Sequence, residues 1–140
     1  MKRLLIAVGI IAALVVSASA YAAANQFLGV VKKGGSTSFT IGTRNKVVRD
    51  FHWNDVPVTC EGLPTHKTST YTFSHTMKVR HAHFHGLDLA PQGGRLRVTG
   101  VLSNHGRRAS GTLKINGDIS EGNACKSGKL QWHAHRVPGH

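Results

Sequence analysis

Short segments in which apolar and polar residues alternate fill the chain from residue 26 onward, and turns rich in glycine and asparagine separate them. Alternation with a period of two is typical of β-strands that bury one face and expose the other. In residues 36–43, for example, Phe39 and Ile41 would face inward while Ser38 and Thr40 face outward. No helical periodicity is evident after residue 25, so the sequence predicts an all-β chain. Its strands are expected at residues 26–32, 36–43, 47–53, 56–60, 68–73, 81–87, 95–103, 109–115 and 129–136.

The number of these segments limits the architecture. Eight or nine strands in a chain of this length imply either two packed antiparallel sheets or a small barrel. We expect the antiparallel β-sandwich, by analogy with sandwiches in which one cysteine pair distant in sequence ties sheet to sheet. Jelly-roll and immunoglobulin-like connections would both produce this pattern, so the strand order stays open.

The N-terminus has the pattern of an export signal. Lys2 and Arg3 form a positive start, and residues 4–16 then form an apolar run. Ala18-Ser19-Ala20 matches the small-residue pattern of a cleavage site. The apolar run is shorter than the ~20 residues that a helix needs to span a bilayer. We therefore predict a cleavable signal-peptide helix rather than the alternative, an uncleaved anchor.

This prediction divides the chain in two. Residues 1–20 would be the signal, with cleavage after residue 24 as an alternative, and residues 25–140 would form a single domain. The domain has no further apolar stretch long enough for a membrane span. It is therefore expected to be secreted, either outside the cell or into a periplasm.

The two cysteines of the chain, Cys60 and Cys125, both lie in the exported part. An oxidising compartment favours a disulfide between them. A bridge over a loop of this length would stabilise the domain by about 4 kcal/mol in the chain-entropy account. Two free thiols, or two cysteines that share a metal ion, are the alternatives.

Several short motifs resemble a group of small secreted bacterial proteins that is largely uncharacterised. The shared pattern is a strand that ends in cysteine, an aromatic-bearing strand before a glycine, and then V-x-G, A-S-G-T-L, C-x-S-G and W-x-A motifs. In this chain they are Cys60, Phe84-His85-Gly86, Val98-Thr99-Gly100, Ala109-Ser110-Gly111-Thr112-Leu113, Cys125-Lys126-Ser127-Gly128 and Trp132-His133-Ala134. The resemblance implies a β-sandwich with paired cysteines, and it implies no activity. The chain departs from the group in its many outward histidines.

Five of those histidines occur at alternate positions of two predicted strands. His81, His83 and His85 would line the outer face of one strand, and His133 and His135 that of another. Neighbouring imidazoles on one strand face can bind Zn²⁺, Cu²⁺ or Ni²⁺. These five residues are therefore candidate ligands of a divalent metal. The alternative is that they are solvated surface positions, because few carboxylates lie nearby to orient the rings.

The chain is also strongly basic. Its 18 Lys and Arg residues outnumber its six Asp and Glu residues by 12, and ten histidines add further charge at low pH. Loss of Lys2 and Arg3 with the signal would leave a domain of net charge +10. Arg95 and Arg97 share one strand face, and Arg107 and Arg108 lie at a turn. Such a domain attracts anionic surfaces, such as cell-wall polymers, polysaccharide, lipid or nucleic acid.

Other function classes lack their signatures. The few aromatic residues are expected in the core, so no stacking platform for a specific nucleic-acid readout is predicted. No nucleophile elbow, phosphate loop or dinucleotide fingerprint occurs. We predict a secreted, non-enzymatic binding or structural module without a cofactor that interacts with an anionic cell-wall polymer or another polyanion. A histidine-rich domain that binds divalent metal is the alternative, and a role of the charge in solubility alone also stays open.

Overall fold

The computed structural model describes residues 25–63, 67–90, 93–120 and 123–138, and the predicted signal lies outside them. The described part is almost entirely β, which confirms the predicted fold class. It contains one short 3-10 turn and no α-helix. The strands are β1 (Gln26–Val31), β2 (Ser36–Ile41), β3 (Val47–Cys60), β4 (Lys67–Thr72), β5 (Met77–Lys78), β6 (His83–Leu89), β7 (Arg95–Ser103), β8 (Arg108–Ser120) and β9 (Asn123–Arg136).

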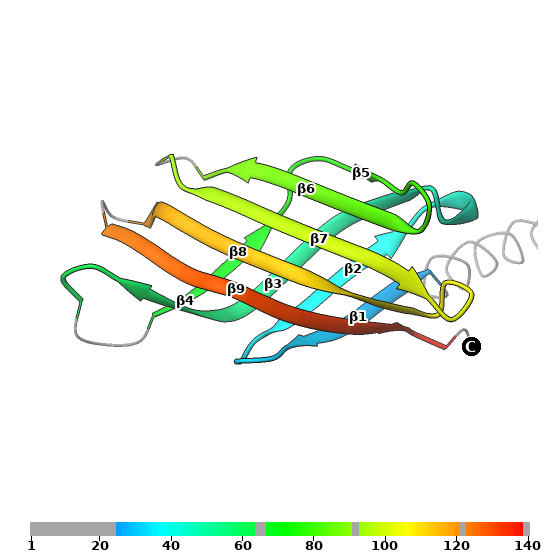
Figure 1. The fold of residues 1–140 in the computed structure, drawn as a ribbon, viewed down its shortest axis with the longest axis horizontal. Helices are drawn as coiled ribbons and strands as arrows, with labels where there is room; N and C mark the ends of the chain where they lie inside the picture. The colour runs from blue at the N-terminus through cyan, green and yellow to red at the C-terminus, as the bar shows by residue number, and fades with distance from the viewer. Residues whose placement is uncertain (1–24, 64–66, 91–92, 121–122, 139–140) are drawn as a thin grey trace, which may run out of the picture.

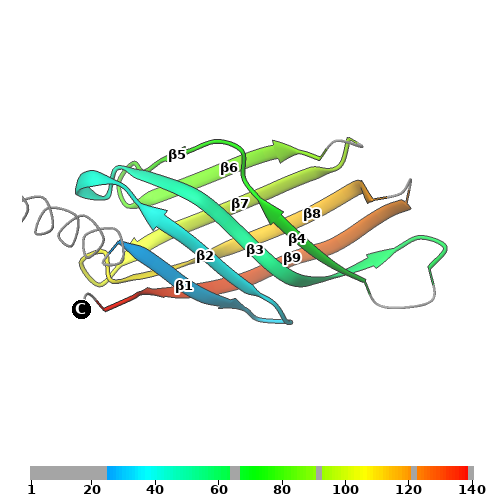
Figure 2. The same ribbon diagram turned by 180° about the vertical axis from the view of Figure 1, so that it is seen from behind.

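These strands belong to one antiparallel sheet in the order β4-β3-β2-β1-β9-β8-β7-β6, with β5 paired to β3. The sheet curls round into a small closed barrel, with β6 to β9 on one side (Figure 1) and β2 to β4 on the other (Figure 2). The expected β-sandwich of two separate sheets is therefore wrong. The reason is that β1 pairs with both β2 and β9, which joins the N-terminal strands to the C-terminal strands without a break.

Strand β3 passes through a position where the sequence suggested a turn. Asp55 has a φ of 53°, and the pairing of β3 with β4 shifts register between Trp53 and Val56. A bulge of this kind bends a strand and leaves its pairing intact on both sides. Bent in this way, β3 pairs with β2 and β4 along its length and with β9 at its end.

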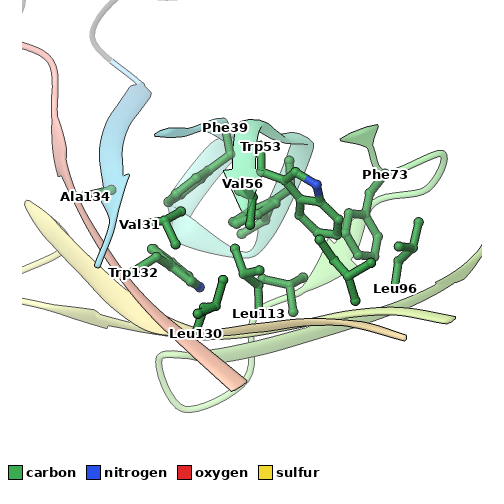
Figure 3. Close-up of a cluster of buried hydrophobic side chains, with 14 of the residues drawn as sticks. Val31, Phe39, Trp53, Val56, Phe73, Leu96, Leu113, Leu130, Trp132 and Ala134 are labelled. Atoms are coloured by element: carbon green, nitrogen blue, oxygen red, sulfur yellow. The ribbon is translucent and has the colours of Figure 1, made fainter. Parts of the chain in front are cut away.

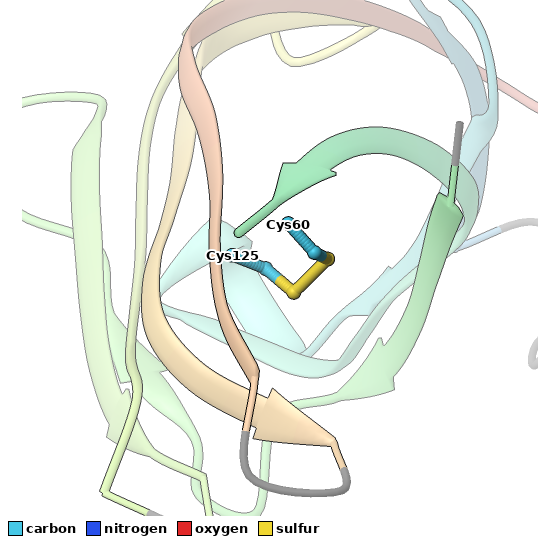
Figure 4. Close-up of a disulfide and its surroundings, with 2 residues drawn as sticks. All are labelled: Cys60 and Cys125. Carbon is cyan, nitrogen blue, oxygen red and sulfur yellow. A yellow bond between two sulfur atoms is a disulfide. The ribbon is translucent and has the colours of Figure 1, made fainter. Parts of the chain in front are cut away.

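The disulfide lies at that end of β3. Cys60 and Cys125 face each other in register on β3 and β9, with their Cα atoms 4.0 Å apart (Figure 4). The predicted pairing is confirmed. The bond ties together two strands that are 65 residues apart in the sequence.

Aromatic rings and glycines share the interior. Phe84, Gly100, Gly111 and Trp132 are consecutive partners across β6, β7, β8 and β9. A Cβ atom at Gly100 would lie 2.2 Å from the Phe84 ring, and one at Gly111 would lie 1.8 Å from the carbonyl oxygen of Thr99. Gly100 thus makes room for the Phe84 ring, and Gly111 lets the backbones of β7 and β8 approach closely. The rings of Phe84 and Trp132 are 6.1 Å apart between centroids, and the two glycines allow the sheet to curve. Figure 3 shows Trp132 among the buried side chains of the core.

Strands β4 and β6 are the two ends of the sheet, and the barrel closes between them. At one end of this seam β5 pairs with β3, and the backbones of Arg80 and His83 exchange two hydrogen bonds. Toward the other end, Asp88 accepts hydrogen bonds from the Tyr71 hydroxyl at 2.8 Å and the Ser74 backbone N–H at 3.0 Å. Within the described part of the chain, no backbone pairing joins β4 to β6, and the hydrogen bonds of Asp88 connect the two strands instead.

The Asp88 contacts change two pKa values. Burial alone would raise the pKa of Asp88, but the hydrogen bonds from Ser74 and Tyr71 and the nearby His75 outweigh it, so the pKa is lowered. Burial, together with the hydrogen bond to the Asp88 carboxylate, raises the pKa of Tyr71 to about 12.

Asp88→Asn is expected to lower the free energy of unfolding by about 1–3 kcal/mol at neutral pH, because a charged acceptor at the seam is lost. A carboxylate with a lowered pKa stabilises the fold above its unfolded pKa of about 4, and this contribution disappears as the pH falls through the folded value. Urea unfolding at pH 7 and at about pH 3 should therefore show a gap between wild type and Asp88→Asn that shrinks at the lower pH. An equal gap at both pH values would contradict this role.

Candidate anion-binding face

The outer surface of β6 to β9 forms one broad side of the barrel, which Figure 1 views from outside. Along β7, buried Leu96 and Val98 alternate with exposed Arg95 and Arg97. The predicted common face of the two arginines is thereby confirmed. Strands β8 and β9 follow the same rule, so their lysines next to buried core residues also point outward.

Strand register brings basic residues of three strands side by side. Arg97 lies directly opposite Lys114, which in turn lies directly opposite Lys129. In the neighbouring row, Arg95 lies opposite Asn116, whose partner on β9 is Lys126. All five cations are exposed. We call Arg95, Arg97, Lys114, Lys126 and Lys129 the basic face.

This arrangement costs stability. Side chains directly opposite on antiparallel strands have Cβ atoms about 4.5–5.5 Å apart, and like charges at this distance repel each other. Within residues 83–117 and 124–136 the only carboxylate is Asp88, which is mostly buried at the seam. The basic face therefore has no acidic partner within those ranges. No salt bridge to these five cations is found among the described residues, and a bound anion would offset their repulsion.

Part of the face is slightly hollowed. Arg95, Arg97, Lys114 and Asn116 line a depression of about 180 Å³. Its donors are two guanidinium groups, one ammonium and one amide. Guanidinium groups bind carboxylate, phosphate or sulfate oxygens in pairs of parallel hydrogen bonds, and ammonium groups act as point charges. The depression can hold an anionic group, and the further cations of β9 extend the positive surface beside it.

The five candidate metal ligands lie in three places. His81 lies in the turn before β6, with a φ of 49°, and so is not part of the predicted strand. His83 and His85 are exposed at alternate positions of β6. His133 and His135 are exposed at alternate positions of β9. The outward orientation expected for the strand histidines is therefore observed.

The structure does not bring the two histidine strands together. Strands β7 and β8 lie between β6 and β9. His83 and His133 occupy one row across the sheet, with one residue of β7 and one residue of β8 between them. Three strand spacings amount to about 14 Å, whereas two ligands of one zinc ion each bind at about 2.0–2.1 Å. Among the described residues, no group of three or more His, Cys, Asp or Glu side chains could hold a metal.

Two lysines of the basic face have a local sequence pattern that predicts their outward orientation. Lys114 and Lys129 each lie one position from an apolar residue in an alternating segment, so their outward orientation could be predicted. Their alignment in one row with Arg97 could not be predicted, because register between strands is not a local property of either strand.

Comparison with protein-family models and with curated proteins finds no match to this chain. Across the part of the chain that the structure describes, no helix has the length and apolar character to cross a membrane.

Proposed function

We propose that this chain is a secreted, non-enzymatic binding module that holds an anionic polymer or anionic surface, such as that of a cell wall, on its basic face. The observation that carries the proposal is the row of Arg97, Lys114 and Lys129, three cations directly opposite one another on adjacent strands. Cations arranged at this cost to the fold are best explained by an anionic ligand that offsets their repulsion.

The shape of the basic face favours a repeating anion over a single small one. Its cations are spaced about 4.8 Å apart across the strands and about 6.6 Å apart along them. They therefore form a lattice over three strands rather than one enclosed pocket. Neighbouring charges of a polyanion can contact several of these cations at once, and each contact releases a counterion.

Two features support an extracellular setting. The N-terminal pattern predicts export, and the Cys60–Cys125 disulfide is typical of proteins in oxidising compartments. Acidic polymers and anionic lipids of the cell surface are the partners that a basic exported domain would meet.

Arg97→Gln, Lys114→Gln and Lys129→Gln combined should weaken binding to long-chain polyphosphate by about 100-fold at low salt, at about 1 kcal/mol per cation removed. The salt dependence should also fall, with the slope of log K against log salt smaller by about 2. Isothermal titration over a salt series measures both quantities.

The matched control removes one exposed arginine and two exposed lysines from outside strands β7 to β9: Lys46→Gln just before β3, Arg49→Gln on β3 and Lys78→Gln on β5. Its net charge equals that of the test variant, so its affinity for polyphosphate should stay several-fold closer to wild type. Equal losses in the two variants would show that total charge, and not the basic face, drives binding. Affinity that does not fall with salt would also contradict the proposal.

A further inference from the structure

Two large apolar side chains border the basic face. Leu87 is 49% exposed and Leu89 is 64% exposed, and both point outward from β6. In register on β7, Leu87 lies opposite Arg97 and Leu89 lies opposite Arg95. On the outer surface, the apolar side chains of β6 therefore lie directly beside the cations of β7, and further cations follow on β8 and β9.

Single exposed leucines are common on protein surfaces. These two leucines lie next to each other on one strand face, and strand register fixes two arginines directly beside them. A hydrated polyanion offers no apolar phase in which the leucines could be buried. A lipid bilayer with anionic headgroups can bind both the leucines and the cations, because its acyl region accepts apolar side chains and its phosphates attract positive charge. Arg and Lys can also lay their aliphatic stems along the interface while the charged ends reach the headgroups.

We propose that the anionic surface bound by the basic face is a lipid bilayer, with Leu87 and Leu89 inserted among the headgroups and acyl chains. This inference rests on the proposed function and identifies its partner. The outer surface of β6 inserts into the bilayer, and the cations of β7 to β9 contact the phosphates of the lipid headgroups. Charge complementarity sets the orientation, and the leucines distinguish a bilayer from a soluble polymer.

A second exposed apolar pair provides a matched control. Leu28 is 43% exposed and Val30 is 49% exposed, both on β1. Their neighbours in register on β9 are His135 and His133 rather than residues of the basic face. The two pairs are similar in exposure, and β9, β8 and β7 separate them.

The experiment measures the partition of the full domain onto sedimented vesicles of equal parts phosphatidylglycerol and phosphatidylcholine, with pure phosphatidylcholine vesicles and long-chain polyphosphate as the other two probes. Wild type should bind the mixed vesicles and polyphosphate but not pure phosphatidylcholine. Leu87→Ser with Leu89→Ser should reduce partition onto mixed vesicles by about tenfold, because two partly inserted leucines are lost. Its affinity for polyphosphate should equal that of wild type. Leu28→Ser with Val30→Ser should leave both affinities within about twofold of wild type, because β1 lies outside the inserted edge.

Insertion can be read directly as well. Leu89→Cys labelled with an environment-sensitive fluorophore should show a blue-shifted emission on mixed vesicles, and the same label at Leu28→Cys should not. Two results would overturn the inference: unchanged vesicle partition of the Leu87→Ser, Leu89→Ser variant, or equal losses from both apolar pairs. Wild type that binds polyphosphate but not mixed vesicles would reject the bilayer and keep the proposed function. Wild type that binds neither would reject the proposed function itself.

Discussion

Replacing Cys60 and Cys125 together by serine is expected to lower the free energy of unfolding by about 4 kcal/mol. The bond closes a loop between residues 65 apart and so limits the unfolded chain severely. A small domain has only about 5–15 kcal/mol of stability in total, so the loss would remove a large part of it. Urea unfolding followed by tryptophan fluorescence measures the effect.

Reduction of the wild-type protein provides the control. A reducing agent removes the same bond without changing any residue, so its effect should match that of the double substitution, and serine itself should add little. The bond also holds the β9 segment that carries Lys126 and Lys129, so reduced protein should bind polyphosphate more weakly. An unfolding midpoint unchanged by both treatments would show that the disulfide contributes no stability.

Trp132→Ala is expected to cost about 3–5 kcal/mol, the range for large aromatic side chains removed from a core. The Trp132 ring lies 5.4 Å from Phe51 and 5.9 Å from Phe39, measured between centroids, on the opposite side of the barrel. It also flanks the backbone of Gly111 on the neighbouring strand. Its removal would leave a cavity between the two sides and an uncovered stretch of the curved sheet. Thermal or urea unfolding measures the loss.

Trp132→Phe separates ring volume from polar effects. The indole Nε1 of Trp132 is buried and has no hydrogen-bond partner among the described residues, so phenylalanine removes no bond. The Trp132→Phe variant should therefore lose much less stability than Trp132→Ala, by about 1.5 kcal/mol or less. If both variants lost the same amount, the cavity account would be wrong.

Much of the local structure could be predicted from the sequence. Alternation assigned Phe39, Ile41 and Trp132 to the interior and Arg95 and Arg97 to one common strand face, as observed. It also explains the outward histidines of β6 and β9. Such assignments succeed because the direction of a side chain depends on its own strand, which has a period of two residues.

Local signals failed where strands bend. The Asn54-Asp55 pair has the residues of a turn, and it forms a bulge inside β3 instead. The expected sandwich failed for the same reason, since strands that bend at bulges and glycines let one sheet curve round on itself. A residue such as Asp55 that accepts a positive φ can occupy a turn or a bulge equally well. Which of the two forms depends on how the neighbouring strands pair with the segment.

By itself the sequence determined the all-β class, the inner and outer positions along each strand and the candidate cysteine pair. The tertiary structure decided which strands are neighbours, and with it the candidate site. It separated His83 and His133 by two strands, and it placed Lys114 and Lys129 in one row with Arg97. The physical reason is that the alternation of inner and outer residues depends on the sequence of each strand alone. Register depends on the backbone hydrogen bonds between strands and on the closure of the barrel around its core.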